Sequence, residues 1–303
     1  MTQSTRVSRT SPPDLDIVIP ARGEVETLRK CLSSVIEDAQ GCNIQVIVVA
    51  NGPERARSLE IVAELTALAT ARGVQLLALA EERPGKANAL NRGDAYRRGG
   101  PVLYLDADIR FLPDSLPSLC EYLNAHDTPR LVAPPRKIAR SPSFVTRHFA
   151  RVWATLPAVA QEVVAVGCYA VNSQGRMRWA EFPNLLNDDA FVRSRFAPTE
   201  RQLLSRGGAL QELPQGPALL STLRRWREGN LQLRDIAAPD ALPEGDRYGS
   251  APDAGMKRNM LHVLRHPSLW VSMPIFLWAT FASRRAGRTL SPQTDWLPAR
   301  SLD

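Results

Sequence analysis

The sequence has few of the features that mark several common classes of protein. Its cysteines form no C-x-x-C pair and are widely spaced, which argues against a zinc site or a disulfide framework and fits a reducing cytosol. No G-x-x-x-x-G-K-[ST] is present, and the first turn after an apolar run, "IPARGEVE", has no G-x-G-x-x-G, so P-loop and dinucleotide-binding folds lose their main support. The N-terminal residues lack the apolar core of a secretory signal, and we expect residues 1–13 to form a disordered tail.

A long, uninterrupted apolar run is also missing. The best candidate, "HPSLWVSMPIFLWATFASRR" (266–285), has an apolar core of about 16 residues that includes Pro274, whereas a spanning helix needs roughly 20. Two Trp residues and basic flanks favour a segment that lies in a membrane interface. A buried terminal helix and a true span are the alternatives.

Length, composition and charge set wide limits. A chain of 303 residues that is 44% hydrophobic and 23% charged can bury the core of one large α/β domain. The net charge of +7 suits phosphate-bearing small molecules, an anionic membrane surface or nucleic acid, and does not choose among them.

The first half of the chain alternates between β-type and helical periodicity. Apolar runs predict strands over 14–21, 43–51, 74–80 and 101–108. Helical spacing of apolar residues predicts helices over 24–39, 57–73 and 85–99. Such alternation indicates an α/β fold with a mostly parallel central sheet and helices on both faces.

The second half is less regular. We expect helices over 114–126, 142–164 (interrupted by Pro157), 187–196 and 216–233, and strands over 129–138 and 166–172. Residues 236–256 are rich in Pro, Gly and Asp and are interpreted as a linker or mobile loop. The predicted organisation is one domain over 14–235 and an amphipathic or apolar C-terminal segment over 257–303.

Asp106 and Asp108 come at the end of the fourth predicted strand, "VLYLDAD". Ligands of open parallel sheets bind beyond the carboxyl ends of the strands. Residues i and i+2 of an extended strand point to the same side, so the two carboxylates can share a divalent cation such as Mg²⁺ or Mn²⁺. The simpler alternative is a turn at the strand end, with Asp108 as a helix cap.

An ordered series of motifs resembles the family 2 inverting glycosyltransferases, which have the GT-A (Rossmann-like) nucleotide-sugar-binding fold. The series covers about residues 14–230 and comprises "DIVIPARGEVETLRKCLSSV", "VIVVANG", "GKANALNRG", "YLDAD", "GCYAVNSQGRMRWAEFPNLLNDDAFVRSRF" and "RRWREG". The resemblance implies transfer of a sugar from a nucleotide-diphospho-sugar to a hydroxyl acceptor, with a divalent metal, in cell-surface polysaccharide or glycolipid synthesis.

The resemblance also implies which residues bind the donor. Base and ribose would be held by Pro20, Ala21, Arg22, Glu24 and Asn51. Family members often have an Asp where this chain has Ala50, Asn51 and Gly52. An Asn amide can still pair with a uracil ring, so a UDP-sugar is the first choice, and another base stays open.

Lys86 and Asn88 would lie near the sugar or phosphates of the donor, as the resemblance implies. A Lys at a helix N-terminus adds charge to an end that already favours anions. In the same way Asp106 would contact the ribose or the metal, and Asp108 would be the direct metal ligand. A solvated Lys86 is the alternative.

Asp188 and Asp189 in "NDDAFVR" match the acidic catalytic pair of the family. Inversion by a single displacement needs a base beside the acceptor hydroxyl, and we assign this role to Asp189, with Asp188 in support. Two Asp residues that open a helix are also a common cap and dipole partner.

Arg225 and Trp226 are the only matches to the Q-x-x-R-W element of processive synthases, because Thr222 stands at the Gln position. This departure argues against a processive synthase. Arg225 could neutralise the departing diphosphate, and Trp226 could stack on an acceptor ring. Alternatively, both belong to a basic amphipathic helix with a core Trp.

Two other functions stay open at this stage. One is a sugar nucleotidyltransferase, which would be expected to have a Gly-rich basic loop after the first strand. The other is a non-catalytic protein that binds a membrane surface or nucleic acid, although base-stacking aromatics are too sparse to favour nucleic acid. For the acceptor we expect a hydroxyl compound, either lipid-linked or near the cytoplasmic face of a membrane.

Overall fold

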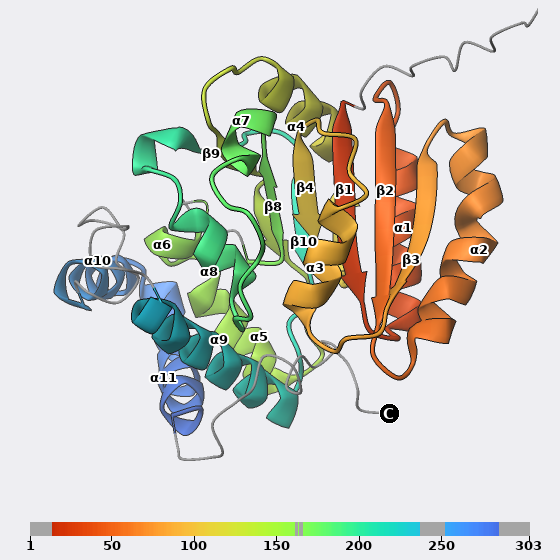
Figure 1. Ribbon diagram of the computed structural model, residues 1–303. Helices are drawn as coiled ribbons and strands as arrows, with labels where there is room; N and C mark the ends of the chain where they lie inside the picture. Colours follow the sequence, from red (N-terminus) through yellow and green to blue (C-terminus); the bar gives the residue numbers. More distant parts are fainter. Residues whose placement is uncertain (1–13, 161–162, 164–165, 237–251, 285–303) are drawn as a thin grey trace, which may run out of the picture.

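The computed structural model describes residues 14–160, 163, 166–236 and 252–284 (Figure 1). The predicted N-terminal tail and residues 237–251 of the predicted linker lie outside the described residues. That linker prediction overlaps α10 (Pro252–Arg265), which begins before residue 256.

A seven-stranded sheet forms the centre of the molecule, with the strand order β3-β2-β1-β4-β8-β6-β9. The four strands from β3 to β4 are parallel, whereas β8 runs antiparallel to both β4 and β6. The bounds are β1 Leu15–Ala21, β2 Ile44–Asn51, β3 Gln75–Glu81, β4 Val102–Leu105, β6 Leu131–Ala133, β8 Cys168–Val171 and β9 Arg201–Leu203. The predicted α/β class with a mostly parallel sheet is confirmed.

Helices cover both faces of this sheet because its strands alternate two sets of apolar side chains. In β1, Ile17 and Ile19 join one core cluster, whereas Val18 joins the cluster on the opposite face. The first face is covered by α1 (Val25–Asp38), α2 (Arg55–Ala71) and α4 (Ser115–Asn124). The second face is covered by α3 (Lys86–Asp94) and α8 (Asp188–Arg193), with the short α7 (Ser173–Arg176) beside β8.

A second, three-stranded sheet has the order β5-β10-β7. Its strands are β5 (Ile109–Leu112), β10 (Gly208–Gln211) and β7 (Arg136–Ile138). The single strand that the sequence predicted over 129–138 is therefore wrong. Pro134 and Pro135, which cannot donate to a sheet ladder, separate β6 from β7, and the two strands belong to different sheets.

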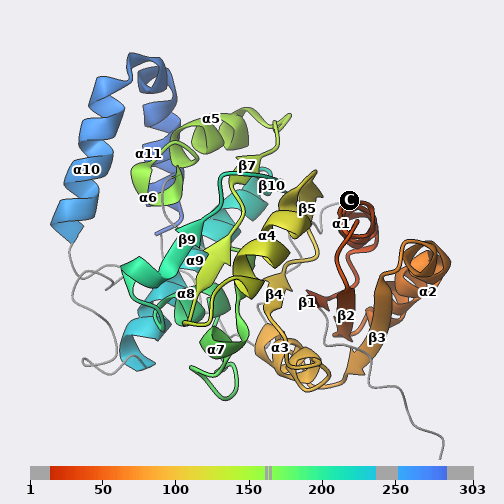
Figure 2. The same ribbon diagram turned by 90° about the horizontal axis from the view of Figure 1, so that it is seen from above.

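The remaining helices gather on the β9 side of the central sheet, away from α2 (Figures 1 and 2). They are α5 (Phe144–Trp153), α6 (Pro157–Ala160), α9 (Pro217–Ile236), α10, the 3₁₀ helix η3 (Pro267–Ser272) and α11 (Met273–Ala282). The apolar run at 266–285 is thus divided between η3 and α11. In the described part of the chain, no helix is both long enough and apolar enough to cross a membrane.

Candidate active site

Asp106 and Asp108 lie in the turn between β4 and β5, not on the strand itself. The strand-alternation argument for their shared direction is therefore wrong, because β4 ends at Leu105. The turn is fixed from β8 instead: the backbone N–H of Asp106 donates to the carbonyl of Gly167 at 2.7 Å. Gly167 has φ +71, and a Cβ there would lie 2.9 Å from Asp106 Oδ2, so the close approach depends on glycine.

Lys86 bridges the two acidic parts of the site. Its Nζ lies 2.7 Å from Asp106 Oδ1 and 2.8 Å from Asp188 Oδ1, and its side chain is only 16% exposed. Burial alone would lower the pKa of Lys86, but the carboxylates of Asp106 and Asp188 raise it above its ordinary value. Lys86 is therefore a fixed cation that links the β4–β5 turn to α8.

Asn51 holds the loop that positions Lys86. Its Nδ2 donates to the carbonyls of Glu81 (3.2 Å) and Arg83 (2.7 Å), and its Oδ1 accepts from the N–H of Gly85 at 3.2 Å. The side chain is buried, and these three bonds use its amide. The structure thus gives Asn51 a loop-holding role, and contact with the nucleotide base stays a prediction.

The acidic pair at the start of α8 is placed asymmetrically. Asp188 is buried and accepts hydrogen bonds from Lys86 and, at 2.7 Å, from the hydroxyl of Tyr169. Asp189 accepts from the backbone N–H of Ala190 at 2.7 Å. Burial and the neighbouring Asp188 raise the pKa of Asp189 to about 7, against the lowering effect of Lys86. A carboxylate with this pKa is suited to general base catalysis near neutral pH.

Asp108 is the least compensated carboxylate of the site. Its Oδ1 is buried without a hydrogen-bond partner. Burial and the nearby Asp106 and Glu24 raise its pKa to about 7, although Arg225 and Lys86 act in the opposite direction. A buried carboxylate oxygen without a partner is costly, and its environment is one that a cation would stabilise.

The carboxylates of Asp106 and Asp108 fit a divalent metal, because the buried oxygen of Asp108 has no hydrogen-bond partner. Carboxylate oxygens are the ligands that Mg²⁺ and Mn²⁺ prefer, and one or two of them suffice when substrate phosphates complete the shell. Within the described residues, no three His, Cys, Asp or Glu side chains are arranged as a complete metal cluster. A metal held here would therefore depend on Asp108, with Asp106, and on oxygens from the ligand.

The other residues predicted to bind the donor lie at the end of β1, in the loop after it and in α3. Pro20 and Ala21 are the last residues of β1 and pair in register with β2. The N–H of Arg22 donates to Glu24 Oε2 at 2.5 Å, and burial raises the pKa of Glu24. Asn88, one turn into α3, donates from Nδ2 to the carbonyl of Pro84 at 2.9 Å. Their contacts with a nucleotide stay predictions.

The helix α9, which carries Arg225 and Trp226, packs beside the start of α8. Asn187, next to Asp188, donates from Nδ2 to the carbonyl of Trp226 (3.0 Å) and to Asn230 Oδ1 (2.9 Å). A Cβ at Gly229 would lie 2.4 Å from Asn187, so α9 approaches this loop closely. The charge of Arg225 lowers the pKa of Asp108, and contact of Arg225 with a diphosphate stays a prediction.

Trp226 stacks on another indole. Its ring centroid lies 5.2 Å from that of Trp153 on α5, at 25° between the planes. Trp226 also packs in an apolar cluster with α5 and α11. This arrangement matches the alternative of a core Trp, and contact with an acceptor ring stays a prediction.

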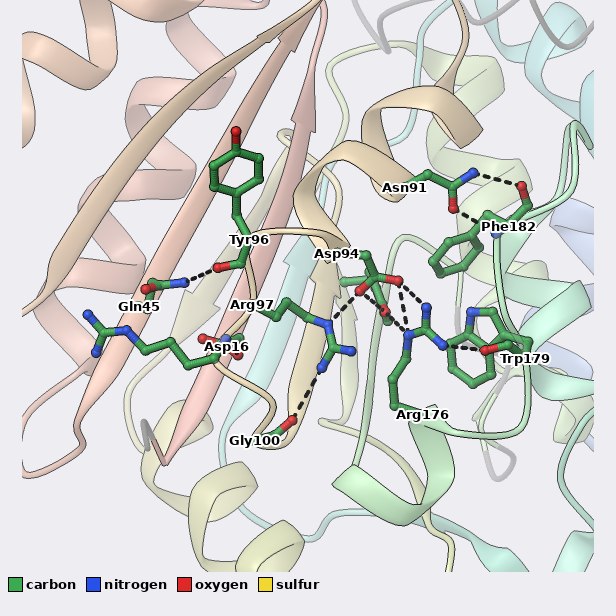
Figure 3. A network of polar contacts seen from close by, with 12 residues as sticks. Asp16, Gln45, Asn91, Asp94, Tyr96, Arg97, Gly100, Arg176, Trp179 and Phe182 are labelled. Atoms are coloured by element: carbon green, nitrogen blue, oxygen red, sulfur yellow. Dashed lines mark hydrogen bonds and ion pairs between the residues drawn. The ribbon is translucent and has the colours of Figure 1, made fainter. Parts of the chain in front are cut away.

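A polar network on the face of the sheet covered by α3 supports the acidic pair (Figure 3). Asp94, near the end of α3, accepts from Arg176 Nε at 2.9 Å and from the hydroxyl of Tyr104 at 2.7 Å. Asn91 exchanges two hydrogen bonds with the backbone of Phe182, at 2.7 and 3.0 Å. The segment that leads into α8 is therefore anchored to α3, which also carries Lys86.

Three functional side chains were not identified from the sequence. Tyr169 holds Asp188, while Asn187 and Asn230 join α8 to α9. Tyr169 stands within the quoted motif "GCYAVN", but its partner is 19 positions away. The sequence around a strand residue such as Tyr169 does not indicate which helix its side chain will contact.

Comparison with known proteins identifies the family of the chain. The model of glycosyl transferase family 2 matches residues 16–181, which is more than half of the chain. An N-acetylglucosaminyltransferase of Rhizobium leguminosarum bv. phaseoli is 31% identical over 108 residues, which are 35% of this chain and 24% of that protein. The chain thus matches about a quarter of the length of this curated relative.

Solved structures share the fold. The mannosyltransferase PcManGT from Pyrobaculum calidifontis, in complex with GDP-Man and Mn²⁺, superposes with a TM-score of 0.55 at 20% identity, over 92% of this chain and 77% of that one. TarS 1–349 of S. aureus, in complex with UDP-GlcNAc, superposes with a TM-score of 0.51 at 15% identity, over 89% and 80%.

The family match and the fold are those of the GT-A type of glycosyltransferase, a class with an α/β sheet that binds a nucleotide-sugar. The chain belongs to glycosyl transferase family 2. Of the functions that the sequence left open, the family match supports an enzyme of the glycosyltransferase type.

Proposed function

We propose that the protein transfers a glycosyl group from a nucleotide-diphospho-sugar to an acceptor hydroxyl with inversion at the anomeric carbon. The observation that carries this proposal is the asymmetry of the acidic pair. Asp188 is fixed by Lys86 and Tyr169, whereas the pKa of Asp189 is raised to about 7. Asp189 is then the base and Asp188 the residue that positions it.

The reaction is a single displacement. Asp189 accepts the proton of the acceptor hydroxyl, whose oxygen forms a bond to the anomeric carbon as the bond to the diphosphate breaks on the opposite face. The electron pair of the broken bond leaves with the diphosphate. Arg225 and Lys86 lower the pKa of Asp108, and Lys86 also pairs with Asp106. Arg225 is assigned to the departing phosphates.

Metal dependence is part of the proposal. Asp108, with Asp106, would hold Mg²⁺ or Mn²⁺, which supplies positive charge to the leaving diphosphate when bound. Its support is the buried, unpartnered Oδ1 of Asp108. The fold neighbour from Pyrobaculum calidifontis is itself a complex with Mn²⁺.

The proposed donor is a UDP-sugar. The support for uridine is the sequence resemblance, and the two fold neighbours named above bind different nucleotides, GDP-Man and UDP-GlcNAc. A role in cell-surface polysaccharide or glycolipid synthesis on the cytoplasmic side of the membrane is proposed on the same basis.

Membrane contact is proposed through the face formed by α10, η3 and α11. Eight of the thirteen large apolar side chains that are exposed in the described residues belong to residues 260–281, so exposed apolar surface is concentrated there. The sequence has no Asp or Glu between Asp253 and Asp295. Apolar side chains, among them Trp270 and Trp278, with basic flanks and no acidic residue suit an anionic lipid surface.

Donor use is tested by melting-temperature shifts against a panel of nucleotide sugars with Mn²⁺, followed by turnover of the best ligand. We expect stabilisation by one nucleotide-sugar series and release of the nucleoside diphosphate, with the β-linked product from an α-linked donor. Release of pyrophosphate from a nucleoside triphosphate and a sugar phosphate would instead contradict the proposal.

Membrane contact has a separate test, co-sedimentation with phosphatidylglycerol and phosphatidylcholine vesicles. The double variant Trp278→Glu/Phe281→Glu should lose binding to the anionic vesicles. Leu68→Glu, which alters an exposed apolar residue on α2, is the control and should bind like the wild type. Equal binding of all three proteins would remove this part of the proposal.

A further inference from the structure

A cavity of about 590 Å³ lies between α5, α9 and α11, outside the candidate active site. Its volume is within the range of small-molecule sites in proteins. Apolar side chains form much of its wall, and Phe149, Trp153 and Phe276 are the aromatic ones. No predicted donor, metal or catalytic residue lines it, and the proposed reaction does not use it.

The aromatic wall is held in place by ring stacking. Phe149 and Phe276 stack with centroids 5.2 Å apart and 21° between their planes. Trp153 is fixed from behind by Trp226, and the guanidinium of Arg136 lies 5.4 Å from its ring centroid. Such a wall offers apolar area with little side-chain entropy left to lose on binding.

The polar edge of the cavity is basic. Arg227 of α9 and Arg284, which follows the end of α11, line it, and both residues are exposed. Among the described residues that line the cavity there is no carboxylate to oppose these cations. An apolar wall with a basic edge is complementary to an amphiphile that carries an anionic group.

The cavity is continuous with the exposed apolar surface of α11. Phe276 lines the cavity, whereas Leu277, Trp278 and Phe281 of the same helix are exposed. The guanidinium of Arg284 lies 5.0 Å from the ring centroid of Phe281, between that surface and the cavity edge. The edge of the cavity therefore adjoins exposed apolar surface of α11.

One hydrogen bond connects the cavity to the catalytic pair. Asn230 lines the cavity, and its Oδ1 accepts from Asn187, which precedes Asp188. The cavity and the acidic pair are thus separated by a single helix, α9. An occupant of the cavity would be held beside the place where the acceptor reacts.

We propose that this cavity binds the hydrocarbon chain of an amphiphilic acceptor, with an anionic group of the acceptor at Arg227 and Arg284. The inference rests on the proposed glycosyl transfer, because it names the chemical class of the acceptor. It commits to a lipid with a hydrocarbon chain and a phosphate-like group near the head.

The test is calorimetric titration with dodecyl phosphate below its critical micelle concentration. Inorganic phosphate tests the phosphate without the hydrocarbon chain, and the neutral detergent dodecyl maltoside tests the chain without the phosphate. Thr280→Trp fills the cavity and Arg227→Glu reverses the charge of its edge. The matched controls are Thr70→Trp and Arg72→Glu on α2, where the Thr70 hydroxyl donates to the carbonyl four residues earlier just as that of Thr280 does.

We expect the wild type and both α2 variants to bind dodecyl phosphate equally. Thr280→Trp should weaken binding at least tenfold, and Arg227→Glu about fivefold to tenfold. Inorganic phosphate should not bind measurably, and dodecyl maltoside should bind more weakly than dodecyl phosphate. Equal affinity of Thr280→Trp and Thr70→Trp, or no binding to the wild type, would overturn the cavity site. Equal affinity for dodecyl phosphate and dodecyl maltoside would overturn the proposal that an anionic group binds at Arg227 and Arg284.

Hydrolysis of the nucleotide-sugar without added acceptor separates this inference from the proposed function. If Thr280→Trp hydrolyses the donor at the wild-type rate but loses transfer to an amphiphilic acceptor, the acceptor assignment is supported. If the wild type binds dodecyl phosphate but neither binds nor hydrolyses any nucleotide-sugar, the proposed transfer fails and the acceptor assignment fails with it. If donor hydrolysis occurs and dodecyl phosphate does not bind, only the cavity inference is overturned.

Discussion

The ammonium of Lys86 lies 2.8 Å from a carboxylate oxygen of Asp188, and this ion pair joins the start of α3 to the start of α8. The same nitrogen also pairs with Asp106. One buried cation therefore holds the turn assigned to the leaving group and the helix assigned to the base at a fixed separation. Because Asp106 and Asp188 both pair with Lys86, a substitution of either carboxylate is expected to alter the environment of the other.

The first prediction concerns the base. Asp189→Asn keeps the size of the side chain but cannot accept a proton, so kcat should fall by about 10²- to 10⁴-fold. The dissociation constant of the donor, measured by calorimetry, should change little, because Asp189 is assigned to the acceptor. The control is Asp127→Asn, which alters an exposed carboxylate. If Asp189→Asn turned over like this control, Asp189 would not be the base.

The second prediction is the pH dependence of kcat/KM. A base must be deprotonated to act, and the pKa of Asp189 is raised to about 7, so activity should rise between pH 6 and 8 and level off above. Asp188→Asn removes a charge that raises this pKa. The rising limb of its residual activity should therefore move to lower pH. If kcat/KM of the wild type instead rose around the ordinary pKa of a carboxyl group, the assignment of Asp189 as the base would be contradicted.

The elements and the order of the motifs could be predicted from the sequence because they depend on local patterns. Continuous apolar runs predicted β1 and β2, which are buried at every position, and helical spacing predicted α1, all close to the expected ranges. The partners of the site could not be predicted in this way. That Lys86 lies between Asp106 and Asp188 follows from the packing of α3 and α8 on one face of the sheet, which no local pattern encodes.

Two further features of the site depend on interactions that local patterns did not reveal. The strand before the two carboxylates ends at Leu105, because the N–H of Asp106 bonds to Gly167 and the chain then turns into another sheet. The sequence also did not indicate that the amide of Asn51 bonds to the loop that ends at Gly85, and contact of Asn51 with a nucleotide base stays a prediction. In both cases the competing interaction comes from a distant part of the chain.

The third prediction tests the metal without an activity assay. Asp108 has a buried oxygen without a partner, and burial together with Asp106 raises its pKa to about 7. A metal that binds only the folded protein stabilises it in proportion to RT ln(1 + [L]/Kd), about 2.7 kcal/mol at 100 times Kd. Mn²⁺ with a nucleoside diphosphate should therefore raise the melting temperature of the wild type.

Asp108→Asn should abolish most of this Mn²⁺-dependent shift. Without metal, its melting temperature should equal or exceed that of the wild type, because the substitution removes an uncompensated buried charge. Asp114→Asn, on a partly exposed carboxylate at the start of α4, is the control and should retain the shift. A shift of equal size in Asp108→Asn would exclude Asp108 as a ligand.

The last prediction concerns the network of Figure 3. Arg176→Met should destabilise the protein by about 2–4 kcal/mol in urea unfolding, because it leaves the buried Asp94 with fewer charge partners. Arg97 and Tyr104 still contact Asp94, so the cost should stay in this range. Arg178→Met, which removes a more exposed pair with Glu200, should cost about 1 kcal/mol or less.

The double variant Asp94→Asn/Arg176→Met separates charge from packing. If the cost of Arg176→Met arises from the charge left on Asp94, removing that charge should restore part of the lost stability, and the two substitutions should be less than additive. Full additivity would show that Arg176 acts through its bonds to the carbonyls of Trp179 and Ala180 instead. Because that segment leads into α8, this second outcome should also lower kcat under conditions in which the variant is fully folded.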